Sequence, residues 1–145
     1  MLIGIDPDVT KSGVAVKNSL GYSLHTLSFF QLFDFLSKHR EKIALVRIEA
    51  AWLIKHNWNK KVTGTAAINA NIGNAAGRNH ETGRKIVEMC QHLSIPFQEV
   101  KPLKKIWKAK DGKISHEELA RMISIPTRTN QEQRDAALMI VGYGN

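Results

Sequence analysis

Cysteine is almost absent from this sequence, and long apolar runs are missing. The single cysteine, Cys90, excludes an internal disulfide framework and a cysteine-rich zinc site. No stretch approaches the roughly 18 consecutive apolar residues that a membrane span needs, and the N-terminus lacks the profile of a signal peptide. We therefore expect a cytoplasmic protein that neither crosses a membrane nor is exported.

Acidic residues are scarce relative to basic ones. The 145 residues include 21 Lys and Arg against 13 Asp and Glu, which gives a formal net charge of +8 and a pI near 9.8. Such a surface favours a polyanionic partner such as nucleic acid, because Lys and Arg neutralise phosphates and release counterions. A solvated basic surface without a binding role is the plainer alternative. The length and the 43% hydrophobic content suit a single domain over residues 1–145.

Hydrophobic patterning predicts strands that alternate with helices. We expect strands at 2–6, 14–16, 22–28, 43–48 and 95–100, the first three forming an antiparallel meander. We expect helices at 31–40, 66–93, 115–123 and 131–142. In the second of these helices, Gly73, Gly77 and Gly83 indicate a start, a kink or the close approach of another helix rather than one uninterrupted rod.

Four acidic residues follow predicted strands or begin a predicted helix: Asp6, Glu49, Glu132 and Asp135. Mg²⁺ prefers oxygen ligands, and two ions about 4 Å apart can activate a water and stabilise the charge that develops on a phosphate. The pattern therefore predicts a divalent-metal site for cutting phosphodiesters. Each residue also has an ordinary structural explanation, because Asp6 suits a turn, Glu49 a solvated strand end, and acidic groups complement the dipole of a helix start.

The motifs around these carboxylates resemble a known family. Ile3-Gly4-Ile5-Asp6-Pro7, followed by Gly13-Val14-Ala15-Val16, is similar to the opening of RuvC-type Holliday junction resolvases in the ribonuclease H-like superfamily. Arg134-Asp135-Ala136-Ala137-Leu138 is similar to their last motif, and the resemblance covers essentially the whole chain. It implies an α/β, ribonuclease H-like fold: a five-stranded mixed sheet in the element order βββαβαβα, with helices on both faces. The short chain is similar to compact phage and mobile-element versions.

The resemblance also implies a chemistry. Asp6, Glu49 and Asp135 would bind two Mg²⁺ ions, with Mn²⁺ as a substitute, and Glu132 would bind metal or position the attacking water. The implied substrate is a four-way DNA junction. Because both symmetric strands must be cut, the implied assembly is a homodimer. The small residues around Gly73 and Gly77 would suit its interface, and packing within the chain is the alternative. A branch-migration helicase is a conceivable but unidentified partner.

Basic and aromatic residues would complete the implied site. Lys105 aligns with a family lysine near the scissile phosphate. His116 stands where the family has a second lysine. Lys104 or Lys113 could take the role of that second lysine. Trp52 matches a family aromatic that inserts among the bases. The alternative is that Trp52 packs in the hydrophobic core. Trp58 is a second stacking candidate.

Two other functions stay open at this stage. A ribonuclease H-like nuclease that acts on structured RNA would have the same fold and carboxylates. A catalytically weak junction-binding protein is the other alternative, because Asp8 and His116 depart from the family pattern.

Overall fold

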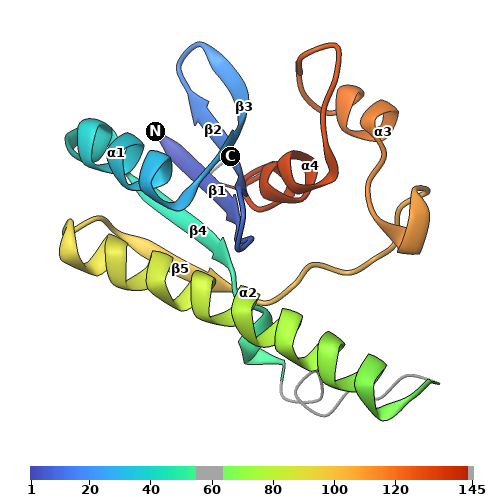
Figure 1. The fold of residues 1–145 in the computed structure, drawn as a ribbon. Helices are drawn as coiled ribbons and strands as arrows, with labels where there is room; N and C mark the ends of the chain where they lie inside the picture. The colour runs from blue at the N-terminus through green and yellow to red at the C-terminus, as the bar shows by residue number, and fades with distance from the viewer. Residues whose placement is uncertain (55–63, 144–145) are drawn as a thin grey trace.

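A five-stranded mixed sheet forms the centre of the protein, whose computed structural model describes residues 1–54 and 64–143 (Figure 1). The strands are β1 (Leu2–Asp6), β2 (Ser12–Asn18), β3 (Gly21–Leu27), β4 (Leu45–Glu49) and β5 (Phe97–Val100). Their order in the sheet is β3-β2-β1-β4-β5. β1 pairs antiparallel with β2 and parallel with β4, so β1 and β4 end at the same edge of the sheet.

Helices cover both faces of this sheet. They are α1 (Phe29–His39), α2 (Ala66–His92), α3 (His116–Ala120) and α4 (Gln131–Leu138). α1 and α2 bury their apolar side chains in one cluster with one face of the sheet, and α3 and α4 form a second cluster on the other face. The predicted fold class is therefore confirmed, with α3 as an additional short helix in the expected order.

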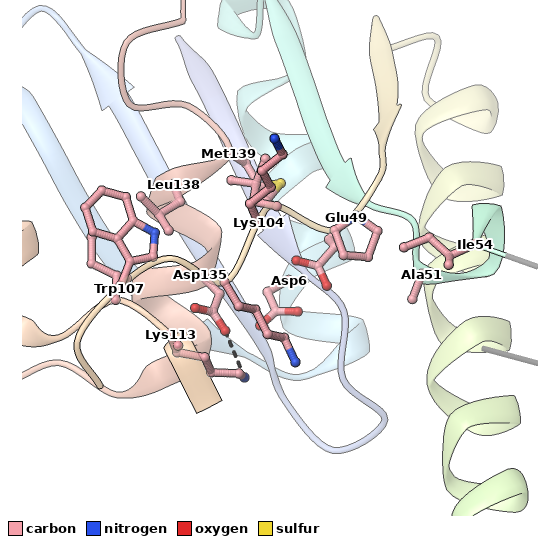
Figure 2. Close-up of a pocket in the computed structure, with 15 residues that line it drawn as sticks. Asp6, Glu49, Ala51, Ile54, Lys104, Trp107, Lys113, Asp135, Leu138 and Met139 are labelled. Atoms are coloured by element: carbon pink, nitrogen blue, oxygen red, sulfur yellow. Dashed lines mark hydrogen bonds and ion pairs between the residues drawn. The ribbon is translucent and has the colours of Figure 1, made fainter. Parts of the chain in front are cut away.

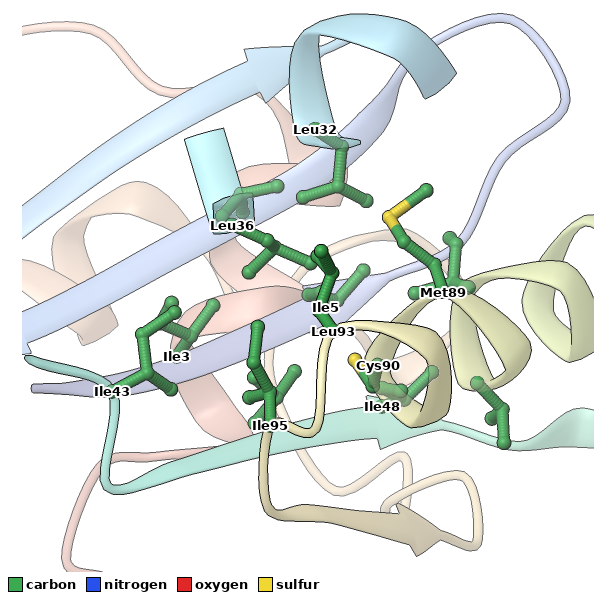
Figure 3. Close-up of a cluster of buried hydrophobic side chains, with 14 of the residues drawn as sticks. Ile3, Ile5, Leu32, Leu36, Ile43, Ile48, Met89, Cys90, Leu93 and Ile95 are labelled. Atoms are coloured by element: carbon green, nitrogen blue, oxygen red, sulfur yellow. The ribbon is translucent and has the colours of Figure 1, made fainter. Parts of the chain in front are cut away.

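The alternation of side chains along β1 and β4 decides which residues face α4. Ile3, Ile5 and Ile48 point into the core under α1 and α2 (Figure 3). Asp6 and Glu49 therefore lie on the opposite face, toward α4, because successive strand residues point to opposite sides. Ile5 is paired with Ile48 on the adjacent parallel strand. Asp6 and Glu49 are the residues that directly follow this pair.

Two strand glycines allow α4 to lie very close to the sheet. A Cβ atom on Gly4 would overlap the carbonyl oxygen of Ala136, and one on Gly13 would overlap that of Glu132. The helix is also fixed at both ends. Asn130 caps its start and donates from Nδ2 to Thr26 Oγ1 at 3.0 Å, while the Arg47 guanidinium donates to the carbonyl of Met139 at its end.

The described helices differ from the predicted ones in length and continuity. α2 runs for 27 residues without a break, so the expected start or kink at its glycines was wrong. Only Gly83 makes the close approach, against the ring of Trp52. The capping box of Ser115 and Glu118 and the cap at Asn130 are confirmed, although α3 and α4 end three and four residues earlier than predicted. Among the described helices, none combines the length and apolar character that crossing a membrane requires.

Candidate active site

Three of the four predicted carboxylates line one cleft. Asp6 ends β1, Glu49 ends β4 and Asp135 lies in the second turn of α4, and all three border a cleft of about 450 Å³ (Figure 2). These residues are far apart in the sequence. The common edge of two parallel strands and the close approach of α4 bring them together, so the sequence-based grouping of these three is reproduced in the fold.

The carboxylates repel one another in a partly dehydrated setting. Burial, followed by the charges of Glu49 and Asp135, raises the pKa of Asp6 to about 8, although Lys113 acts in the opposite direction. The pKa of Glu49 is also raised, first by burial and then by Asp135, with Lys113 and Lys105 opposing the shift. Binding of a cation lowers the free energy of such a cluster, because its positive charge compensates for the lost hydration of the carboxylates and for their mutual repulsion.

A lysine already contacts the third carboxylate. Lys113 Nζ lies 3.1 Å from Asp135 Oδ2, and Gln131 Nε2 donates to Asp135 Oδ1 at 2.7 Å. Burial alone would lower the pKa of Lys113, but the hydrogen bond and charge of Asp135, then the charges of Asp6 and Glu49, raise it overall. Lys113 is therefore charged at neutral pH, and both oxygens of Asp135 have partners.

The chemistry of these donors fits a divalent ion, although they do not yet converge on one point. Within residues 1–54 and 64–143, no group of three His, Cys, Asp or Glu is arranged to hold a metal. Asp6 and Glu49 supply the oxygen ligands that Mg²⁺ prefers, at a buried place with excess negative charge. Asp135 is instead held by Lys113 and Gln131, so the site fits Mg²⁺ best between Asp6 and Glu49.

Glu132 stands apart from the other three carboxylates. Its side chain is exposed in the first turn of α4 and is not among the residues that line the cleft. Its charge has the smallest of the effects on the pKa of Asp6. Glu132 is three residues before Asp135, about one helical turn nearer the start of α4. Its role as a metal ligand or a water-positioning group stays a prediction.

A tight hairpin carries the lysines of the site. Lys104, Lys105 and Lys113 all line the cleft. Trp107 N donates to Gly112 O at 2.9 Å, and Ala109 N donates to Lys113 O at 2.9 Å. Gly112 has a φ of +73°, and a Cβ there would stand 2.6 Å from the carbonyl oxygen of Lys105. This turn therefore needs glycine, and it places Lys105 and Lys113 on the same cleft.

Trp107 is a cleft residue that the sequence reasoning missed. Its indole is half-buried beside Leu138 at the wall of the cleft (Figure 2). The available signal was an aromatic residue within the lysine-rich segment 101–113, a combination typical of nucleic-acid contact surfaces.

Trp52 is packed into the fold rather than presented to a ligand. Only 9% of it is exposed, and its ring lies against Gly83 with the Arg84 guanidinium 5.7 Å from the ring centroid. The core alternative thus describes its place in this structure, although Trp52 also borders a small cavity of about 130 Å³ that Asp6 and Glu49 share. Trp58 lies outside the described residues.

His116 and Asp8, the two departures from the family pattern, both have local partners. His116 Nδ1 lies 2.8 Å from Thr129 Oγ1, and His116 is outside the set of residues that line the cleft with Lys104, Lys105 and Lys113. Asp8 Oδ1 accepts from Thr10 N at 2.8 Å, which closes a turn. Asp8 is not among the charges that shift the pKa of Asp6. Neither residue lines the cavities that Asp6 and Glu49 border.

Comparison with known proteins supports the fold assignment. No protein-family model matches the sequence, and no curated protein matches it. T. thermophilus RuvC in complex with Holliday junction substrate is similar in structure, with a TM-score of 0.54 and 14% identity over 97% of this chain and 89% of that chain. A second T. thermophilus RuvC structure has a TM-score of 0.44 and 16% identity over 97% and 90%. The chain has the ribonuclease H-like α/β fold of RuvC.

Proposed function

We propose that the protein is a divalent-metal-dependent endonuclease that resolves four-way DNA junctions. The observation that carries this proposal is the meeting of Asp6, Glu49 and Asp135 from three elements in one cleft bordered by lysines. The RuvC fold and the junction bound by T. thermophilus RuvC support the substrate. The net charge of +8 supports a polyanionic ligand.

The cleft can serve phosphodiester hydrolysis in a defined way. A water oxygen bonds to phosphorus and loses a proton, the bond from phosphorus to O3′ breaks, and O3′ takes up a proton, which leaves a 5′ phosphate. When bound, Mg²⁺ supplies a water of lowered pKa and stabilises the developing charge. Asp6 and Glu49 would hold it, and the ammonium group of Lys105 would offset charge on the phosphate.

A homodimer is part of this proposal. The N-terminal half of α2 extends past the sheet (Figure 1), and Ile68 and Ile72 on it are 47% and 39% exposed. A Cβ on Gly73 or Gly77 would meet no described atom within 4 Å, so the helix around these glycines is open on the side that a second copy could contact. Light scattering should report a dimer, and Ile72→Glu should shift it toward the monomer, whereas an unchanged mass would argue against this interface.

The central experiment is cleavage of a synthetic four-way junction with Mg²⁺ or Mn²⁺. We expect Asp6→Asn and Asp135→Asn to lose cutting, and Asp34→Asn to retain it, since Asp34 is exposed on α1 at the opposite face of the sheet. All three variants make the same chemical change. Undiminished cutting by either of the first two would contradict the proposed site.

Substrate choice needs its own comparison. A junction, a flap and a structured RNA should be offered at equal concentration, and preferential cutting of the RNA would favour the ribonuclease alternative. Retained junction affinity without metal binding or cutting would favour the binding-protein alternative. The cytoplasmic location and a helicase partner stay predictions.

A further inference from the structure

The ammonium group of Lys113 occupies the space where a cation would be expected beside Asp135. Its Nζ lies 3.1 Å from Asp135 Oδ2, and the side chain of Asp135 is only 16% exposed (Figure 2). Gln131 Nε2 donates to the other oxygen of Asp135 at 2.7 Å. A metal ion beside Oδ2 of Asp135 would be repelled by the Lys113 ammonium group, whereas the neutral amide of Gln131 would not oppose it.

The backbone holds Lys113 in this position. Ala109 N donates to Lys113 O at 2.9 Å, and Lys113 N donates to Lys110 O at 3.3 Å. The positive φ of Asp111 and Gly112, +59° and +73°, reverses the chain just before it. Lys113 thus starts from a fixed turn and lines the cleft, where its side chain, 39% exposed, is held by the ion pair with Asp135.

The charges of the cleft also limit the number of ions. Asp6, Glu49 and Asp135 carry three negative charges when ionised, and Lys113 carries one positive charge. One divalent ion then brings the four side chains to neutrality, because two and one positive charges offset three negative ones. Lys104 and Lys105 line the same cleft and add further positive charge. A second divalent ion would therefore leave a large positive excess in a partly buried site, which is unfavourable unless Lys113 leaves.

We propose that Lys113 takes the place of a second metal ion, so that each active site binds a single divalent ion between Asp6 and Glu49. This inference rests on the proposed nuclease function and replaces the two ions that the family resemblance implies with one. The ammonium group would offset phosphoryl charge on the side of Asp135, where it donates a charge-assisted hydrogen bond to substrate oxygens. Asp135 thereby positions Lys113 rather than a metal.

Metal stoichiometry tests this proposal without relying on activity. Equilibrium dialysis against Mn²⁺, with anomalous scattering from Mn²⁺-soaked crystals, should give one ion per wild-type chain. Lys113→Ala and Lys113→Met should each bind two, because Asp135 becomes available. Lys113→Arg keeps the charge and should bind one. Lys110→Met, a change at an exposed lysine of the same turn, should also bind one. Circular dichroism identifies folded variants, and Met retains most of the lysine stem if Ala disturbs the turn.

The outcomes separate this inference from the function on which it rests. Two ions in the wild-type protein would overturn the role of Lys113 and leave the nuclease proposal intact. One ion in both uncharged variants would also overturn it, because Lys113 would not be what excludes the second ion. No bound ion in any variant would overturn both the inference and the metal-dependent function.

Discussion

Gly4 on β1 lies directly against the carbonyl group of Ala136 on α4, with no space for a side chain between them. Asp135 precedes Ala136, so this contact sets how closely the Asp135 carboxylate approaches Asp6 at the end of the same strand. Gly13 makes the equivalent contact with Glu132. The glycines of the first two strands thus determine the shape of the carboxylate cleft through the position of α4.

Replacement of Gly4 by Ala should therefore damage both stability and activity. Overpacking of this kind costs typically about 1–3 kcal/mol, because the helix must move away from the strand. Urea unfolding measures the loss, and junction cleavage should fall in the fraction that remains folded. Ser37→Ala is the control, because Ser37 is exposed on α1 at the opposite face of the sheet. Wild-type stability and cutting in Gly4→Ala would contradict this view of α4.

Asp6→Asn should separate stability from catalysis. The amide removes the charge that burial and the neighbours Glu49 and Asp135 disfavour, so the metal-free variant should melt at a higher temperature than the wild type near pH 8. It should nevertheless lose Mg²⁺-dependent cleavage by at least about a hundredfold, because a metal ligand contributes several kcal/mol of transition-state stabilisation. A variant that is less stable than the wild type, or one that cuts normally, would contradict the assigned role of Asp6.

The same carboxylate predicts a pH dependence of stability. The pKa of Asp6 is raised from 3.8 to about 8, so the folded protein holds a proton that the unfolded chain releases. The stabilisation that comes from the proton on Asp6 is fully present below about pH 4 and is lost as the pH rises to about 8. We expect the melting temperature of the metal-free wild type to fall across this window relative to Asp6→Asn, as scanning fluorimetry can measure.

Mn²⁺ should restore the melting temperature that the metal-free protein loses as the pH rises, and the effect should be larger at high pH. The ion binds the ionised carboxylate, so its stabilising effect should grow as the pH approaches 8. A difference between wild type and Asp6→Asn that is flat with pH would argue against the raised pKa.

The central part of the site could be predicted from the sequence because its carboxylates stand at the end of apolar strands or the start of an apolar helix, within motifs that resemble a known family. Apolar residues at positions 3, 5, 46 and 48 fix the buried face of each strand, and the carboxylates at its end follow by alternation. Asp135 followed from the start of an apolar helix. Its depth in the cleft did not, because that depends on the contact with Gly4, which joins segments far apart in the chain.

The rest of the site depends on tertiary contacts that no local pattern encodes. Lys113 was one of several lysines in a basic segment, and only the turn at Gly112 directs it to Asp135. Glu132 shares a helix with Asp135, yet one turn along the axis was enough to leave it exposed. Trp52 could be assigned to neither core nor ligand until the packing of α2 placed Gly83 against its ring.

Trp52→Ala should act mainly on stability. The side chain is 9% exposed and fills the space beneath Gly83, so truncation would leave a cavity and cost about 3–5 kcal/mol. Thermal unfolding measures this effect, and Trp52→Phe should lose less. Full stability of Trp52→Ala together with weaker junction binding would instead favour the base-insertion role that the family resemblance implies.

Trp107→Ala should act mainly on nucleic-acid binding. The indole lines the cleft on the hairpin that carries Lys105 and Lys113, where a base or sugar could pack against it. Stacking on an aromatic ring is worth about 1–3 kcal/mol, so junction affinity should fall by about five- to 150-fold, and Trp107→Phe should retain most of it. Fluorescence anisotropy with a labelled junction in Ca²⁺ measures binding without cutting, provided Ca²⁺ does not support cleavage. Because part of the ring packs on the cluster beneath α4, an unfolding curve must accompany each measurement. A variant that binds the junction as tightly as the wild type would place Trp107 in the wall of the cleft with no role in recognition.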